Sequence, residues 1–207
     1  MRERSSGPAP SKSISCLRKN RNILCGDRMP EIQIRPAVVA DIAQLIAIDH
    51  SYTSDNVWQM DIAAENGQMA IQFRETRLPR SVRVEYPRHP QSLSADWRKR
   101  AGLLVAVHEQ EVVGYISIEK DIAPAMAWVT DLAVLRRLRR QGIGSALVLA
   151  GQEWSLHHKL YRMVLEMQPK NYPAISLSQK LGFDFCGYND RYYVNNDIGL
   201  FFAKTLR

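Results

Sequence analysis

The sequence LAVLRRLRRQGIGSAL spans residues 132–147 and carries the strongest structural signal in the chain. Its apolar start is typical of a strand and its basic middle of a turn, and two glycines, Gly142 and Gly144, open an apolar helix. Glycines lack Cβ atoms, so a phosphate group could approach the backbone closely there. The free N–H groups and positive dipole end of the helix would hold it. Four arginines just before a helix start, where cations are unfavourable, favour a bound polyanion.

A tight turn with a basic surface is the alternative interpretation of this stretch, and the glycines alone would not exclude it. Two familiar phosphate-binding motifs do not fit. A dinucleotide-binding fingerprint would need glycine or alanine where Leu147 stands, and the lysine of a P-loop is missing. The motif therefore does not favour NAD or ATP.

The rest of the chain predicts a mixed α/β sheet without internal repeats. Asn66-Gly67 joins two alternating runs, 56–64 and 69–74, which is typical of a hairpin. Residues 108–111 join a second pair of strand-like runs. Further strands are predicted at 32–35, 127–134, 161–167, 183–188 and 198–204, and helices at 40–48, 93–100, 142–158 and 172–181.

Residues 139–144, RRQGIG, resemble the R/Q-x-x-G-x-G/A pyrophosphate signature of the GNAT superfamily of N-acetyltransferases. A second block, with Glu166, Asn171, Ala174-Ile175 and KLGF at 180–183, resembles the family's E…N…A…K-x-G-F segment. The matching order of elements runs from Ile32 to the C-terminus. The resemblance implies a GNAT fold over residues 31–207, with a central mixed, mostly antiparallel sheet flanked by helices.

Two shorter segments, IDHSYTSDNVW at 48–58 and FCGY at 185–188, are similar to streptothricin acetyltransferases. That resemblance implies a β-hairpin in place of the second helix, acetylation of a small cationic amine, and a role in antibiotic resistance. A related GNAT enzyme with another amine remains an alternative. So do acetylation of a protein N-terminus or lysine, and a non-catalytic acetyl-CoA-binding module.

The family resemblance implies acetyl-CoA as co-substrate, with the N–H of Val134 donating to the thioester carbonyl. Asn171 would contact the cofactor arm, although an asparagine there also suits a helix N-cap, and both can hold. The implied cofactor-binding residues are Leu132, Ala133, Val134, Arg139, Arg140, Gln141, Gly142, Ile143, Gly144, Ser145 and Asn171.

Acetyl transfer also requires the acceptor amine to lose a proton, since a lysine-like amine has a pKa of about 10.4. Asp131 is our first candidate for the base or for orienting the ammonium; a solvent-facing strand residue is the alternative. Asp49, Asp55 and Asp61 are candidates for holding a cationic substrate, and each could equally be a surface acid. The sequence shows no metal site.

The protonation of the leaving thiol departs from the family pattern. The family often places a tyrosine four residues after the alanine that corresponds to Ala174, and this chain has Ser178 there. Serine is a poor acid. Tyr193, which we expect the closing strands to carry near the cofactor, is the best substitute; a strand aromatic that merely packs on a neighbour is the alternative.

Composition and charge limit the partners. Hydrophobic content is 45% and net charge +7, but residues 1–30 hold seven Lys/Arg against two acids, and the other 177 hold 21 against 19. The first 30 residues are therefore predicted to be a disordered basic tail, and Met29 could be the true start. We favour an inert extension for this tail; a basic arm that binds nucleic acid and an organelle-targeting peptide are the alternatives, and nucleic acid is disfavoured as a partner. Three cysteines without pairing motifs, and no span-length apolar run or secretory signal, predict a cytoplasmic protein without a membrane. A homodimer remains open.

Overall fold

The computed structural model describes residues 30–207, so the expected basic tail, with Cys16 and Cys25, lies outside the described residues apart from Pro30. The strands are β1 (Gln33–Pro36), β2 (Tyr52–Glu65), β3 (Gln68–Val84), β4 (Gly102–His108), β5 (Glu111–Glu119), β6 (Met126–Val134), β7 (Arg162–Met167), β8 (Asp184–Asn189) and β9 (Gly199–Thr205). The α-helices are α1 (Ile42–Ala47), α2 (Ser92–Asp96), α3 (Ile143–His157) and α4 (Tyr172–Lys180).

Seven of these strands form the central sheet, in the order β1-β4-β5-β6-β7-β9-β8. Every neighbouring pair is antiparallel except β6 and β7. The parallel pair is the one joined through a helix, α3, because parallel neighbours need a long crossover. The predicted mixed, mostly antiparallel sheet is confirmed.

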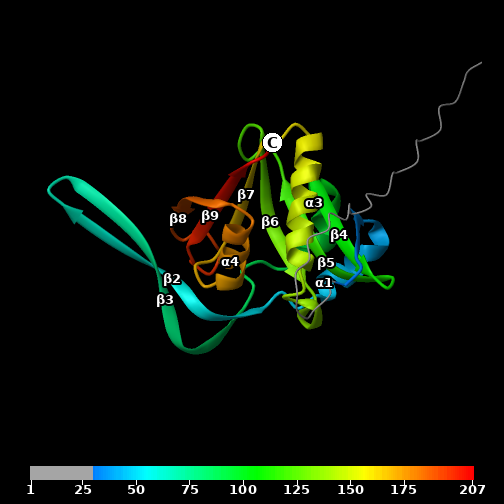
Figure 1. Ribbon diagram of the computed structural model, residues 1–207, viewed down its shortest axis with the longest axis horizontal. Coiled ribbons are helices and arrows are strands. Elements are labelled where there is room, and N and C mark those ends of the chain that lie inside the picture. Colours follow the sequence, from blue (N-terminus) through cyan, green and yellow to red (C-terminus); the bar gives the residue numbers. More distant parts are fainter. Residues whose placement is uncertain (1–29) are drawn as a thin grey trace, which may run out of the picture.

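Helices cover both faces of the sheet (Figure 1). Alternate residues of a strand point to opposite faces, and β4 shows the result: Leu104 and Ala106 join the main core under α3, whereas Leu103 and Val105 join a smaller cluster with α1 and α2. The helix α3 lies very close to the sheet at Gly151, where an added Cβ would stand 3.1 Å from the Cδ1 of Ile116.

The sheet is split between its two parallel strands. Residues 126–129 pair with residues 162–165, and the pairing then stops although both strands continue. Arg88 bridges the split, since its guanidinium donates to the Thr130 carbonyl on β6 at 2.9 Å and bonds to Glu166 on β7. The carboxyl ends of the two strands are thereby held apart.

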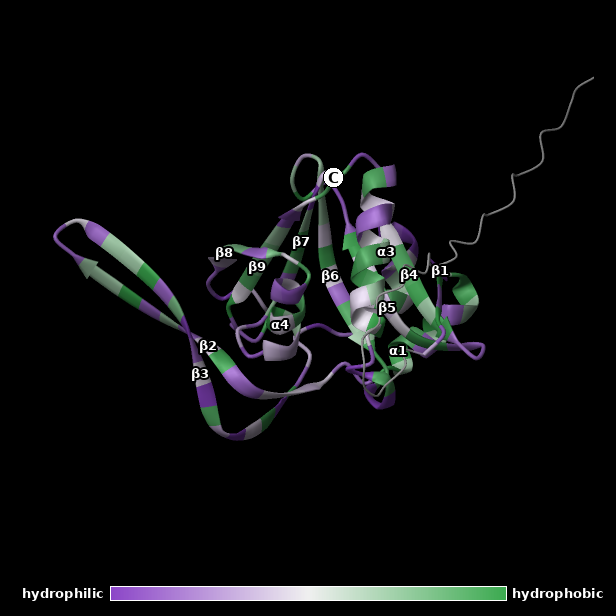
Figure 2. Cartoon of the chain, in the orientation of Figure 1, coloured by the Kyte–Doolittle hydropathy of each residue, from purple (hydrophilic) through white to green (hydrophobic). Residues whose placement is uncertain are grey.

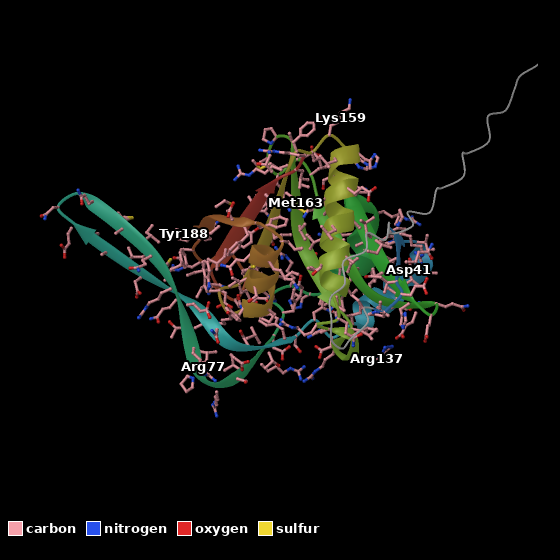
Figure 3. The ribbon with its side chains drawn as sticks, viewed as in Figure 1. Asp41, Arg77, Arg137, Lys159, Met163 and Tyr188 are labelled. Carbon is pink, nitrogen blue, oxygen red and sulfur yellow. The ribbon has the colours of Figure 1, made fainter. Side chains whose placement is uncertain are left out.

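The hairpin of β2 and β3 replaces a helix between α1 and α2, as predicted. Its turn has Asn66 at φ 51° and Gly67 at φ 78°, the left-handed pair that a tight hairpin turn requires. The strands are 14 and 17 residues long and extend far beyond the body of the molecule (Figure 1). The hairpin contacts the body where Trp58 and Phe73 pack against Phe185 of β8. Figure 3 labels Tyr188, which lies at this junction, and Arg77, which lies on β3 on the side of the junction away from the hairpin tip.

Candidate active site

The turn after β6 places the N-terminus of α3 next to the C-terminal end of that strand. Arg140 (φ 69°) and Gly142 (φ 86°) are both left-handed, which reverses the chain within a few residues. Gly142 is the N-cap of α3 and offers no side chain to cap the helix. The first intrahelical bond found there runs from the Ala146 N–H to the Gly142 carbonyl. The N–H groups of Ile143, Gly144 and Ser145 are consequently free to bind an anion.

A cavity of about 490 Å³ opens in front of this turn; we call it the pocket. One wall is the end of β6 and the start of α3, and another is α4 with its N-cap Asn171. Of the eleven predicted cofactor-binding residues, the pocket is lined by Leu132, Ala133, Val134, Arg139, Arg140, Gly142, Gly144, Ser145 and Asn171. The other two point elsewhere: the Ile143 side chain is buried in the core, and Gln141 donates to the Arg137 carbonyl at 3.4 Å.

Arg139 and Arg140 differ in what they can offer a ligand. The Arg139 guanidinium donates to three carbonyl oxygens, those of Val134 (2.8 Å), Ser51 (2.6 Å) and Asp49, and its burial lowers its pKa. It therefore ties the end of β6 to the segment before β2. Within the described part of the chain, Arg140 has no side-chain hydrogen bond or ion pair and stands free at the pocket.

Asn171 is the N-cap of α4, and its side-chain oxygen accepts from the Ala174 N–H at 3.2 Å. It also lines the pocket, so both interpretations of this residue are compatible with the geometry. Ser178, four residues after Ala174, is fully buried and donates to the Ala174 carbonyl at 2.8 Å. The position where the family often has tyrosine thus faces the core and not the pocket.

The end of the pocket away from α3 is aromatic, with His50, Tyr52 and Tyr86. The Nδ1 of His50 faces the Ile48 carbonyl at 2.6 Å, and its Nε2 faces the hydroxyl of Tyr115 at 2.9 Å. A carbonyl only accepts, so Nδ1 carries the proton and Nε2 accepts from Tyr115. Burial lowers the pKa of His50, which keeps the ring neutral at neutral pH.

Asp131 lies directly behind Tyr86. It is 6% exposed, which excludes the solvent-facing strand position considered above. The Tyr86 hydroxyl donates to its carboxylate, Thr130 donates at 2.9 Å, and Arg100 stands 3.8 Å away. Burial and the neighbouring Asp131 raise the pKa of Tyr86 well above its usual value, so this hydroxyl keeps its proton.

We expected the closing strands to carry Tyr193 near the cofactor, but it lies in the loop between β8 and β9, outside both strands. It is buried, which raises its pKa, and the Arg88 guanidinium stands 5.3 Å from its ring centre. It is not among the residues that line the pocket. Its neighbour Tyr192 donates to Glu166 at 2.7 Å.

The three acids predicted to hold a cation are spread along the hairpin and are not brought together. Asp49 precedes it and accepts from the Ser51 N–H and hydroxyl, which together lower its pKa. Asp55 lines a separate surface hollow with residues 77–81. Asp61 pairs with Arg74 at 3.1 Å far out on the hairpin.

Several residues of the site have no counterpart in the sequence analysis. Arg88 and Tyr86 belong to the YPRHP segment at 86–90, whose prolines suggested only a chain break. The segment returns from the hairpin across the split in the sheet. Tyr52 and His50 belong to the segment that resembles streptothricin acetyltransferases. The polar and aromatic residues that follow one another in that segment were the signal that could have identified both as residues of the site. Across residues 30–207, no three side chains of His, Cys, Asp or Glu gather so that they could hold a metal ion.

The model of the acetyltransferase (GNAT) family matches residues 70–183, more than half of the chain. The chain belongs to the GNAT acetyltransferase family. As a GNAT acetyltransferase it acts with acetyl-CoA, and the pocket fits that co-substrate: an anion site of free N–H groups stands next to the end of β6, where β7 no longer pairs with it. None of the helices in the described part of the chain is long and apolar enough to cross a membrane.

This GNAT enzyme is similar to proteins of more than one specificity. An N-alpha-acetyltransferase from Sulfurisphaera tokodaii is 31% identical over 123 residues, which are 51% of this chain and 70% of the relative. The structure of a nourseothricin acetyltransferase has a TM-score of 0.71 at 20% identity, covering 85% of this chain and 99% of that one. A protein from Bacillus anthracis described as a streptothricin acetyltransferase, in complex with acetyl coenzyme A, has a TM-score of 0.68 at 18% identity, covering 84% and 99%.

Proposed function

We propose that this enzyme transfers the acetyl group of acetyl-CoA to a primary amine of a small cationic molecule, with streptothricin-type antibiotics as the first candidates. The observation that carries the proposal is the continuity of the pocket, which runs from the free N–H groups of α3 to the aromatic end at Tyr52 and Tyr86. An acyl donor and an amine can therefore meet in one cavity. On this proposal residues 31–207 form the catalytic domain, and the enzyme works in the cytoplasm, where it would confer resistance.

The cofactor end of the pocket supplies anion binding. The N–H groups of Gly144 and Ser145, with the Arg140 guanidinium, would hold the pyrophosphate, and Arg139 would keep the turn in place. The backbone of β6 at Leu132 and Val134 would bond the arm of the cofactor, because β7 has already separated from it. Acetyl-CoA supplies the activated acyl group.

The acceptor end supplies proton transfer. We assign to Asp131 the role of orienting the Tyr86 hydroxyl and accepting, through it or through water, the proton that the amine loses. Asp49, kept ionised by Ser51 and next in sequence to His50 of the pocket, is the acid we retain for attracting a cationic substrate. Asp55 and Asp61 stand further out on the hairpin and would act only on a long substrate.

The leaving thiolate needs a proton, and three tyrosines can be compared for this role. General acid catalysis typically contributes about 10²–10⁴-fold. Replacing the acid by phenylalanine should therefore lower turnover by about that range at unchanged acetyl-CoA affinity. Tyr52 and Tyr86 are candidates because they line the pocket. Tyr193 is a candidate because the family resemblance favours it. Steady-state kinetics of Tyr52→Phe, Tyr86→Phe and Tyr193→Phe make the comparison, with Ser178→Ala as the control, expected to keep full turnover.

The decisive experiment is a thiol-release assay with acetyl-CoA and a panel of amines: a streptothricin, free β-lysine, lysine, polyamines and short peptides with free N-termini. We expect the highest kcat/KM for the streptothricin. A second candidate function, N-acetylation of a protein N-terminus, is favoured by the N-alpha-acetyltransferase relatives. Preference for peptides would establish it in place of our proposal. Binding of acetyl-CoA without turnover of any amine would indicate a non-catalytic module.

A further inference from the structure

The outer half of the β2–β3 hairpin, residues 58–75, lies outside the pocket; we call it the arm. In its register Met60 stands opposite Phe73, Ile62 opposite Ile71 and Ala64 opposite Met69. Cross-strand partners point to the same face, and so do alternate residues of one strand. All six apolar side chains therefore share one face, which we call the apolar face.

The opposite face of the arm is polar. Gln59 stands opposite Arg74 and Asp61 opposite Gln72, and the Arg74 Nε donates to Asp61 at 3.1 Å. Figure 2 shows apolar and polar positions alternating along both strands of the arm. Such alternation is typical of a sheet with one buried and one solvated face.

The apolar face is covered only near the body. Phe73 packs on Phe185, but further out the exposed fraction is 39% at Ile71 and 56% at its cross-strand partner Ile62, and it reaches 69% at Met69 near the tip. At about 3.3 Å per residue, the eight residues from 58 to 65 extend roughly 25 Å. An isolated two-stranded ribbon is at best marginally stable in water, so the arm needs a partner surface.

The body continues the apolar face at the root of the arm. Phe185, on β8, is 40% exposed, and β8 is the last strand of the sheet. Each chain thus carries an apolar ribbon that projects from it and, beside the root of that ribbon, an apolar sheet edge of its own.

We propose that the apolar face of the arm packs against the same face of a second copy of this chain. The two arms would run antiparallel about a twofold axis, so that each tip, with Ala64 and Met69, covers the root and Phe185 of the other copy. In a contact about a twofold axis, the same surface patch of both copies forms the interface. Between residues 60 and 73 this face carries no charged side chain, which suits a partner that is equally apolar and long, and the chain itself provides one.

The area available matches what a dimer needs. Burying one large apolar side chain removes on the order of 100 Å². Ile62, Met69, Ile71 and Phe185 from two copies therefore give roughly 800 Å², and the alanines and backbone between them bring the total to about 1,000 Å². That is about the lower limit for a specific interface, so the dimer should dissociate on dilution.

Sedimentation velocity of the full-length protein over a hundredfold concentration range tests the proposal. We expect a concentration-dependent dimer for the natural sequence. Ile71→Asp should weaken it more than about tenfold, because it buries an unpaired carboxylate in the interface of both copies. Ala70→Asp is the matched control: it adds the same charge one residue away, on the polar face, and should leave the dimer intact.

Acetyl-CoA affinity, measured in the same variants, should not change, because the arm lies outside the pocket. Met69→Asp repeats the test at the tip of the arm. The proposal is overturned by a natural protein that stays monomeric at every concentration, or by equal weakening in the two aspartate variants at 70 and 71. It does not depend on which amine the enzyme acetylates.

Discussion

Gly144 stands in the first turn of α3 with the pocket on one side and α4 on the other. A Cβ at this position would lie 3.6 Å from the Leu177 Cδ2, an ordinary contact, so the fold has room for a side chain. Gly144→Glu should abolish acetyl-CoA binding, since its carboxylate would occupy the anion site, while the fold persists. Calorimetry measures the affinity, and Gly144→Ala is the control for bulk without charge. Unchanged affinity in the glutamate variant would contradict the assignment of the anion site.

His50 gives a prediction for pH. Its pKa is lowered by burial, so the folded protein binds this proton less readily than the unfolded chain, whose histidine pKa is about 6.5. The stability linked to His50 is therefore fully present above that value and is lost as pH falls through the lowered pKa. We expect the melting temperature to fall between pH 7 and pH 5, and less steeply in His50→Gln. His158→Gln, at an exposed histidine, should keep the natural slope.

Among single residues, the sequence predicts those whose role depends on neighbours that are close in the chain. The glycine turn could be predicted because strand end, turn and helix start are contiguous in the sequence, and nine of the eleven predicted cofactor-binding residues line the pocket. Tyr86 was missed because a residue that returns from a long hairpin leaves no local pattern. The bonds of Arg139 to three carbonyls were equally invisible, since two of those carbonyls are almost ninety residues away.

Among the elements, β5 and β6 lie so close together at Gly114 that a side chain added to β5 would displace β6. An added Cβ at Gly114 would stand 2.7 Å from the Ala133 carbonyl oxygen, a backbone atom that cannot move cheaply. Gly114→Ala should therefore push β6 away, destabilise the protein by about 1–3 kcal/mol and weaken acetyl-CoA binding, because Ala133 lines the pocket. Urea unfolding and calorimetry measure the two effects.

Val113→Ala is the matched control on the same strand. Val113 is fully buried, so its truncation should cost stability by leaving a cavity, yet it leaves the backbone of β6 in place. Equal losses of affinity in the two variants would show that lower stability alone accounts for the weaker binding at Gly114.

Local patterns predicted the elements well where residues alternate or repeat at helical spacing. Asn66-Gly67 predicted the position of the hairpin turn, and α3 and α4 begin and end within a residue or two of their expected bounds. Tyr193 was misplaced because residues 190–198 carry neither pattern and only tertiary contacts, such as that with Arg88, position them. The split between β6 and β7 could not be predicted, since it depends on Arg88 bonding to both strands.

For the whole molecule, we propose that the domain that binds acetyl-CoA needs only residues 29–207. All of the pocket and core residues named above lie in that range, and residues 1–28 are predicted from composition to add little core. Removing residues 1–28 should leave the melting temperature and the rate of acetyl transfer unchanged. A large decrease in either would show that the segment docks on the domain.

The split in the sheet also has a mechanical consequence. The strands β1, β4, β5 and β6 form one plate, and β7, β9 and β8 form another, joined edge to edge along only four pairs of residues. Because so few backbone pairs join them, we expect the two plates to be coupled mainly through the main core, which contains Ile116 of the first plate and Met163 of the second. Arg88 bonds to both, and Glu166 connects the second plate to Tyr192 in the loop beyond β8. We expect a ligand that bonds to the ends of both β6 and β7 to add a further link between the plates, at the point where Arg88 and Glu166 already connect them to that loop.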